Sequence, residues 1–120
     1  MRFFFHDKDK DVLVLVLDAQ INAYGADDML DELDRFTEAG VRLLIVDCSQ
    51  LGYITSQGIG RLFRVHKRVW EKQGEVRLAA VGRVVARILE ITRLNAVFQA
   101  QPTLDEALRS LREGEAERGS

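Results

Sequence analysis

Continuous apolar runs alternate along this chain with segments in which apolar residues recur at helical spacing. The first two runs, RFFFH and VLVLVLDAQI, predict two strands joined by the charged turn DKDKD. The run VLVLVL shows no alternation of apolar and polar residues, so the second strand should be buried on both faces. A third buried strand is expected in VRLLIVDCS, which begins at Val41.

Four segments have the period of an amphipathic helix. The first runs from Asp27 to Ala39 and is closed by Gly40, and the second follows Ser56. The residues of the second helix expected on its core side are Ile59, Leu62, Phe63, His66, Val69 and Trp70, and those expected on a separate basic side are Arg61, Arg64 and Arg68. VVARILEITRL predicts the third helix, and TLDEALRSLR predicts the fourth, with Thr103 as N-cap and Glu106 completing a capping box.

The strands EVRLAAVG and AVFQA lie between these helices, so strands and helices alternate after an initial hairpin. This order predicts an α/β fold, a mixed and mostly parallel sheet of four or five strands with about four helices packed on it. We expect residues 1–113 to form one domain, and the polar segment 114–120 to be disordered. The expected core includes Leu13, Leu15, Leu44, Val46, Leu62, Phe63, Leu78, Ile88 and Leu108.

Charge is unevenly distributed along the chain. Residues 1–55 carry eleven acidic and five basic side chains, whereas residues 56–93 carry nine basic and three acidic ones. The basic stretch lacks interleaved aromatic residues, and the chain as a whole is mildly acidic, with a pI near 5.7. We therefore expect no direct binding of nucleic acid.

The cysteine content and the lengths of the apolar segments bear on redox chemistry and on the cellular compartment of the protein. Cys48 is the single cysteine, so no internal disulfide exists, and its place after a buried strand predicts a packing role. The opening MRFFFHDKDKD offers no secretory apolar region, and VLVLVL is far too short to cross a membrane. These features predict a cytoplasmic protein without membrane insertion.

The usual signatures of enzymes are absent from the sequence. It has no GxxxxGK[ST], GxGxxG, HExxH, CxxC or GxSxG motif, and its only histidines are His6 and His66. The sequence therefore predicts no catalytic residue, no metal site and no cofactor.

The stretch YITSQGIG places Thr55 and Ser56 side by side before two glycines, at the expected start of the second helix. Either hydroxyl could cap that helix. Two glycines in a first helical turn each cost up to about 1 kcal/mol relative to alanine, so Gly58 and Gly60 suggest that the backbone is closely approached there. A hydroxyl at the positive end of a helix also suits phosphate.

At these residues the chain resembles the anti-sigma factor antagonists of the STAS-domain family. The central segment LLIVDCSQLGYITSQGIGRLFRVHKRVWEKQGEVRLAAV is similar to the family's strand, phosphorylated loop, helix and following strand. LDAQINAYGADDML occupies the place of an early loop and helix, and VARILEITRLNAVFQAQPTLDEAL is similar to the closing elements. The family's phosphorylated serine falls on Ser56 and its motif glycine on Gly58, while Gln57 replaces a second serine. Thr55 and Asn22 stand where the family frequently has aspartates.

The resemblance implies partner switching. An unmodified antagonist binds an anti-sigma factor serine kinase and frees a sigma factor, and phosphorylation of Ser56 by that kinase ends the binding. The implied partner-binding residues are Asn22, Thr55, Ser56, Gln57, Gly58, Arg61 and Arg64. Arg61 and Arg64 would dock acidic groups or hold the phosphate, or they would simply form a solvated basic face.

Two other functions remain open from the sequence. A receiver-like phosphoacceptor would use Asp47, but it should also show an acidic pair after the first strand, where Asp18 stands alone, and a lysine late in the chain, where none follows Lys72. A non-switching STAS scaffold or accessory subunit would bind its partners through the same fold without turnover. Phosphorylation of Ser56 by a cognate kinase distinguishes the three.

Overall fold

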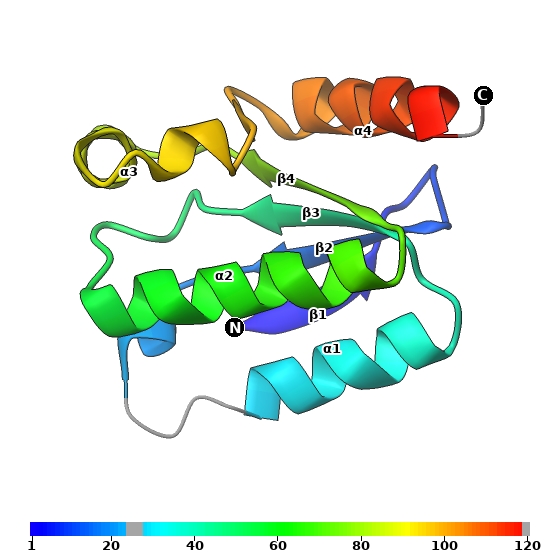
Figure 1. The fold of residues 1–120 in the computed structure, drawn as a ribbon, viewed down its shortest axis with the longest axis horizontal. Helices are drawn as coiled ribbons and strands as arrows, with labels where there is room; N and C mark the ends of the chain where they lie inside the picture. The colour runs from blue at the N-terminus through cyan, green and yellow to red at the C-terminus, as the bar shows by residue number, and fades with distance from the viewer. Residues whose placement is uncertain (24–27, 119–120) are drawn as a thin grey trace.

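Five strands form one mixed sheet in the order β1-β2-β3-β4-β5. The computed structural model describes residues 1–23 and 28–118. β1 is antiparallel to β2, and the remaining neighbours are parallel (Figure 1). The elements are β1 (Arg2–Phe5), β2 (Val12–Val16), the 3-10 turn η1 (Ala19–Asn22), α1 (Asp28–Glu38), β3 (Leu43–Asp47), α2 (Ser56–Glu71), β4 (Glu75–Ala79), α3 (Arg83–Ile91), the 3-10 turn η2 (Leu94–Ala96), β5 (Ala100–Gln101) and α4 (Leu104–Arg118). The predicted α/β architecture, including the initial hairpin, is confirmed.

Helices cover both faces of the sheet. Leu13 and Leu15 of β2 share a core with residues of α1, α2 and α3, whereas Val12 and Val14 pack with Ala107 and other residues of α4. Figure 1 shows α1 and α2 on one side of the sheet and α4 on the other. All five residues of β2 are buried, so the prediction that VLVLVL is covered on both faces is confirmed.

The turn between β1 and β2 contains no glycine, and a histidine side chain supports it instead. His6 Nδ1 accepts hydrogen bonds from the backbone N–H groups of Lys8, at 3.2 Å, and Asp9, at 3.1 Å. Since a turn must satisfy its backbone donors, the imidazole performs the role that a favourable turn residue usually has. His6 is therefore a structural residue.

The fourth helix is longer than the sequence indicated. Arg112 donates hydrogen bonds to Asp9, at 3.0 Å, and to Asp11, at 2.6 Å, which connects α4 to the β1–β2 hairpin. The helix continues to Arg118, so most of the segment 114–120, for which we expected disorder, is helical. The last two residues lie outside the described part of the chain.

The rotational phase of α2 differs from the prediction. Its buried apolar side recurs at intervals of four, three and four residues: Gly58, Leu62, Val65 and Val69. This phase leaves Phe63 39% exposed and Trp70 60% exposed, although both were expected in the core. His66 is half-buried, and Arg61, expected on the solvated basic side, lies beside the buried stripe and is 6% exposed.

Smaller differences concern the closing elements. Ile88 and Leu108, expected in the core, are half-buried and pack against its edge. Arg93 has a left-handed conformation, with φ of 62°, and the chain turns there into η2. β5 covers only Ala100–Gln101, so the strand expected in AVFQA overlaps it at Ala100 alone. The Oγ1 of Thr103 accepts from the N–H of Glu106 at 3.1 Å, as the predicted N-cap requires.

Candidate functional site at the start of α2

The hydroxyl of Thr55 caps α2. Thr55 has the extended backbone of an N-cap residue, with φ of -92° and ψ of 173°, and its Oγ1 accepts from the N–H of Gly58 at 3.2 Å. Ser56 is the first residue of the helix and is exposed. The two neighbouring hydroxyls therefore lie in different environments, one engaged in the cap and the other accessible.

Asn22, from the end of η1, joins the early loop to this helix start. Its Oδ1 accepts from the backbone N–H of Thr55 at 2.8 Å and from the Thr55 hydroxyl at 3.1 Å. Its Nδ2 donates to the carbonyl oxygen of Tyr53 at 3.2 Å. Because the amide both accepts and donates, an asparagine fits this position in a way that a carboxylate, which only accepts when ionised, does not.

The two glycines of the first turn have different surroundings. A Cβ on Gly58 would overlap Asn22 Oδ1 and would approach Ile54 Cγ1 to 2.7 Å, whereas a Cβ on Gly60 would have nothing within 4 Å. Gly58 is therefore required for the close approach of Asn22. Gly60 leaves the outer surface of the first turns open beside Ser56.

Arg61 is a structural connection and not an exposed binding residue. Its Nη1 donates to the carbonyl oxygen of Ile21 at 2.7 Å, in a buried position that fixes η1 against α2. No local spacing in the sequence signals this role, because the acceptor lies 40 residues earlier in the chain. The expectation that Arg61 lies on a solvated face of the helix is thus wrong.

The predicted site residues come together around one shallow depression. Its volume is about 280 Å³, and it is lined by Ser56, Gln57, Gly60, Arg61 and Arg64. Arg64 is exposed and Gln57 is half-buried. Asn22, Thr55 and Gly58 are not among its lining residues and contact one another at the same helix start. No acidic residue lies in the first turn of α2, so the positive end of the helix dipole acts on Ser56 without a neighbouring carboxylate in that turn.

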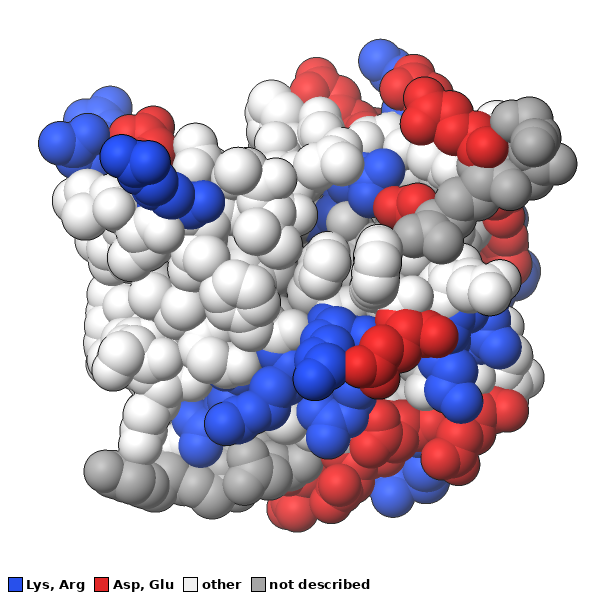
Figure 2. Space-filling view, viewed as in Figure 1, with Lys and Arg blue, Asp and Glu red and all other residues white. Residues whose placement is uncertain are grey.

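Charge is arranged in two parallel rows next to this depression. Figure 2 shows basic side chains along α2 and acidic side chains along α1 below them. The rows meet where Arg68 Nε lies 2.8 Å from Asp34 Oδ1. The exposed basic charge of Arg64 therefore lies on the side of α2 that faces α1.

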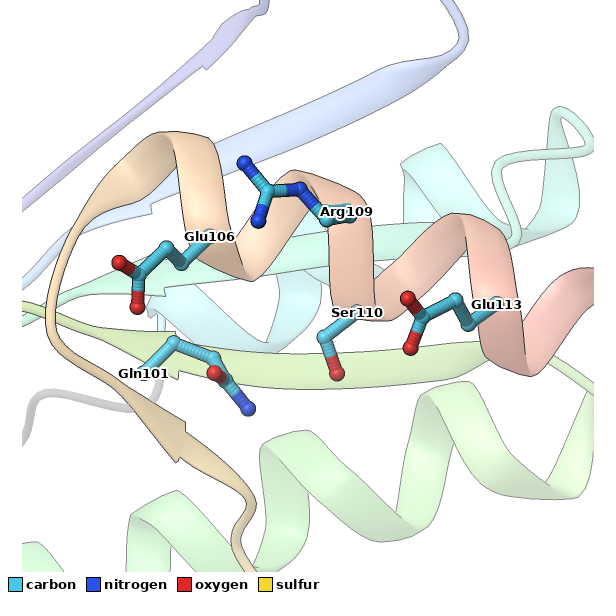
Figure 3. A pocket seen from close by; sticks show the side chains of 5 residues that line it. All are labelled: Gln101, Glu106, Arg109, Ser110 and Glu113. Carbon is cyan, nitrogen blue, oxygen red and sulfur yellow. The ribbon is translucent and has the colours of Figure 1, made fainter.

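A second hollow, on α4, is polar and open (Figure 3). It has a volume of about 230 Å³ and is lined by Gln101, Glu106, Arg109, Ser110 and Glu113. Its hydroxyl is already engaged, because Ser110 Oγ accepts from Nε of the buried Arg77 at 2.7 Å. We assign this hollow a structural role.

The other side chains that could react or titrate have structural contacts. Cys48 is 2% exposed, and burial, assisted by the Asp47 carboxylate, raises the pKa of its thiol to about 12. Asp47 Oδ1 accepts from the N–H of Ser49 at 2.9 Å, and Asp18 pairs with the N-terminal ammonium at 3.0 Å. His66 packs edge-on against Phe98, and burial lowers its pKa.

Residues 1–23 and 28–118 hold neither a cluster of metal ligands nor a membrane-spanning helix. They contain no group of three or more His, Cys, Asp or Glu side chains that could hold a metal ion. Within the same ranges, no helix has the length and apolar character needed to span a bilayer.

Comparison with known proteins identifies the family. The family model of the STAS domain matches residues 6–107, which is most of the chain. The chain therefore belongs to the STAS domain family, as the resemblance around Ser56 predicted. The anti-sigma factor antagonists of this family generally act by binding other proteins.

Individual relatives agree with this assignment. BtrV of Bordetella bronchiseptica, named as a candidate anti-sigma factor antagonist, is 28% identical over 92 residues, or 77% of this chain and 79% of BtrV. An anti-sigma factor antagonist from Mycobacterium paratuberculosis has a similar structure, with a TM-score of 0.74 and 23% identity over 92% of this chain and 93% of the other. Unphosphorylated SpoIIAA gives a TM-score of 0.72 at 15% identity, over 93% and 97% of the two chains. The structural likenesses show the fold.

Proposed function

We propose that this chain is an anti-sigma factor antagonist that acts by partner switching in the cytoplasm. Unphosphorylated, it binds an anti-sigma factor serine kinase through the surface around Ser56. The kinase then transfers the γ-phosphoryl group of ATP to Ser56 Oγ. A new O–P bond forms, the bond to ADP breaks, the hydroxyl proton is lost, and the complex dissociates.

The observation that carries this proposal is the contrast between Ser56 and Thr55. The Thr55 hydroxyl accepts one hydrogen bond and donates another within the site, at 3.2 and 3.1 Å. Phosphorylation there would remove the donated bond and disturb the cap. Ser56 is exposed beside an open glycine, and a kinase can reach its hydroxyl without unfolding the first turn.

A phosphate at Ser56 is compatible with the free protein and disruptive in a complex. It adds about 1.5 to 2 negative charges and three acceptors, which the helix N-terminus and the nearby basic side chain of Arg64 stabilise. An interface fitted to a small neutral hydroxyl cannot take up this volume and charge without loss of contacts. One group can therefore reverse binding while the fold is kept.

Phosphate mapping tests the proposal. The chain would be incubated with an anti-sigma serine kinase from its own organism and Mg-ATP, and then digested and analysed by mass spectrometry. We expect one phosphate on Ser56 and none on the Ser56→Ala variant, which should still bind the kinase. Phosphate on Thr55 in place of Ser56, or no phosphate on a chain that binds the kinase, would contradict the mechanism.

A non-switching STAS scaffold or accessory subunit is the alternative. It is favoured by the side chains at positions 22 and 55, because Asn22 and Thr55 form a complete hydrogen-bonded network without any carboxylate. In that case the chain would bind its partner equally well with serine, alanine or aspartate at position 56. The variant Ser56→Asp therefore distinguishes the two functions, because partner switching requires it to bind more weakly than the parent.

A further inference from the structure

Large apolar side chains are exposed on α2 and on the chain segment around α3. We use the term apolar band for five residues: Phe63 and Trp70 of α2, Val84 and Ile91 of α3, and Val97, which follows η2. Their exposed fractions are 39%, 60%, 56%, 67% and 38%, respectively. Exposed apolar surface of this extent commonly marks a site of interaction with another protein.

The α2 part of the band is in line with the candidate phosphorylation site. Seven residues make almost two helical turns, so Ser56, Phe63 and Trp70 follow one another along the same side of α2. All three are exposed. A partner that lies along this side of the helix would therefore cover the site and the two aromatic side chains together.

The band continues from α2 toward α3. The ring of Phe63 packs against the buried ring of Phe98 at 5.5 Å, which brings the adjacent Val97 close to α2. On α3, Val84 and Ile91 are again seven residues apart and lie on one side of the helix, where Arg87, three residues after Val84 and four before Ile91, is their neighbour. Figure 2 shows a broad uncharged surface between α2 and α3.

A basic edge borders the band along α2. Arg64 is exposed and also lines the depression that contains Ser56. The Lys67 side chain is 74% exposed, and its Nζ lies 3.8 Å from Oε1 of the exposed Glu71. Among residues 1–23 and 28–118, no hydrogen bond or ion pair joins Arg64 to another side chain. This arrangement of an apolar surface with a positive edge is complementary to an apolar surface with an acidic edge.

We propose that the apolar band is part of the docking surface for the anti-sigma kinase, which presents apolar side chains to the band and acidic side chains to Arg64 and Lys67. This inference rests on the proposed function and adds the chemistry of the partner surface. Aromatic side chains at the centre of an interface commonly carry much of its binding energy, and charges at its edge mainly set orientation and association rate. The band provides the contact area, and the phosphate on Ser56 then decides whether the contact can form.

Binding measurements with matched variants test this docking surface. The probe is the anti-sigma kinase, saturated with a non-hydrolysable ATP analogue and titrated calorimetrically with the unphosphorylated chain. We expect the double variant Val84→Ser/Ile91→Ser to bind about tenfold or more weakly, because both side chains are exposed and their loss spares the core. The control is Phe4→Ser, which changes an exposed apolar residue of the edge strand β1, and it should bind like the parent.

Trp70 provides an independent measurement, because it is the only tryptophan in the chain. Fluorotryptophan incorporated into this chain alone gives a single fluorine NMR resonance, which should shift and broaden when the kinase binds. A resonance that is unchanged in the saturated complex would place Trp70 outside the interface and contradict the proposal.

The outcomes separate this inference from the proposed function. If the kinase binds, phosphorylation of Ser56 weakens binding, and the Val84→Ser/Ile91→Ser variant matches the parent, then the docking surface is wrong and partner switching stands. If the variant loses only self-association in gel filtration, the band is an interface between copies of this chain and the proposal is overturned. A kinase that does not bind the parent chain would refute both.

Discussion

Replacing Gly58 by alanine should destabilise the protein, whereas the same replacement at Gly60 should stabilise it. The two glycines lie two residues apart in the same helix, so their intrinsic helix propensities are comparable. In each case alanine gains up to about 1 kcal/mol from propensity. Their surroundings make the difference, because only a Cβ at Gly58 meets Asn22 Oδ1 and Ile54 Cγ1.

The size of the effect follows from the bonds that Asn22 would lose. A methyl group on Gly58 displaces Asn22 Oδ1, which accepts two hydrogen bonds from Thr55, each worth about 1 kcal/mol net. Crowding against Ile54 adds about 1 kcal/mol or more. Subtracting the gain in propensity leaves a loss of about 1 to 3 kcal/mol for Gly58→Ala, against a gain of about 0.5 to 1 kcal/mol for Gly60→Ala.

Urea unfolding followed by far-ultraviolet circular dichroism measures both variants directly. The free energies of unfolding should differ by about 1.5 kcal/mol or more between them. Equal stabilities would show that Asn22 does not pack against Gly58, and the account of the site's support would fail. The variant Asn22→Ala/Gly58→Ala is a further control, because without the asparagine side chain the added methyl should cost less.

Other consequences of the structure can be measured separately. Thr55→Ala should lower the free energy of unfolding by about 1 kcal/mol or more through loss of the cap, while Thr55→Ser should retain most of it, and equal unfolding curves for both variants would contradict the capping role. The buried thiol of Cys48 should resist alkylation at neutral pH until the protein unfolds, and Cys48→Ala should leave partner binding intact. The contribution of this buried, protonated thiol to the free energy of unfolding should be complete below its ordinary pKa of 9.0 and should be lost as the pH rises toward about 12. Urea unfolding at a series of pH values measures this loss. The hydrogen bond from Arg112 holds the pKa of Asp11 below its ordinary 3.8. The stability that this ion pair contributes should therefore be present above pH 3.8 and lost as the pH falls below it. Because the pair is exposed, Asp11→Asn should lower the free energy of unfolding in urea at neutral pH by less than about 1 kcal/mol.

The order of elements could be predicted from the sequence because each buried strand is a continuous apolar run. VLVLVL, covered on both faces by α4 and by the other helices, is the clearest example. The phase of α2 could not be predicted in the same way. The apolar residues span a wider arc of its circumference than the buried stripe does, and the pattern alone does not show that Phe63 and Trp70 lie outside the core.

The site was predictable in its position and not in its internal arrangement. The glycines and paired hydroxyls of YITSQGIG mark a helix start, but the hydrogen bonds of Asn22 to Thr55 connect residues 33 positions apart. The burial of Arg61 likewise depends on the Ile21 carbonyl, 40 residues earlier in the chain. Contacts of this kind arise from the tertiary fold, and no local spacing in the sequence reports them.

The central claim, that a phosphoryl group on Ser56 reverses partner binding, is tested most directly by comparing affinities of the same chain before and after modification. The phosphorylated chain would be purified, and calorimetric titration would give its Kd for the anti-sigma kinase beside that of the unmodified chain. The account predicts binding weaker by tenfold or more, about 1.4 kcal/mol, after phosphorylation. Equal affinity of the two forms would contradict it and would favour the scaffold function.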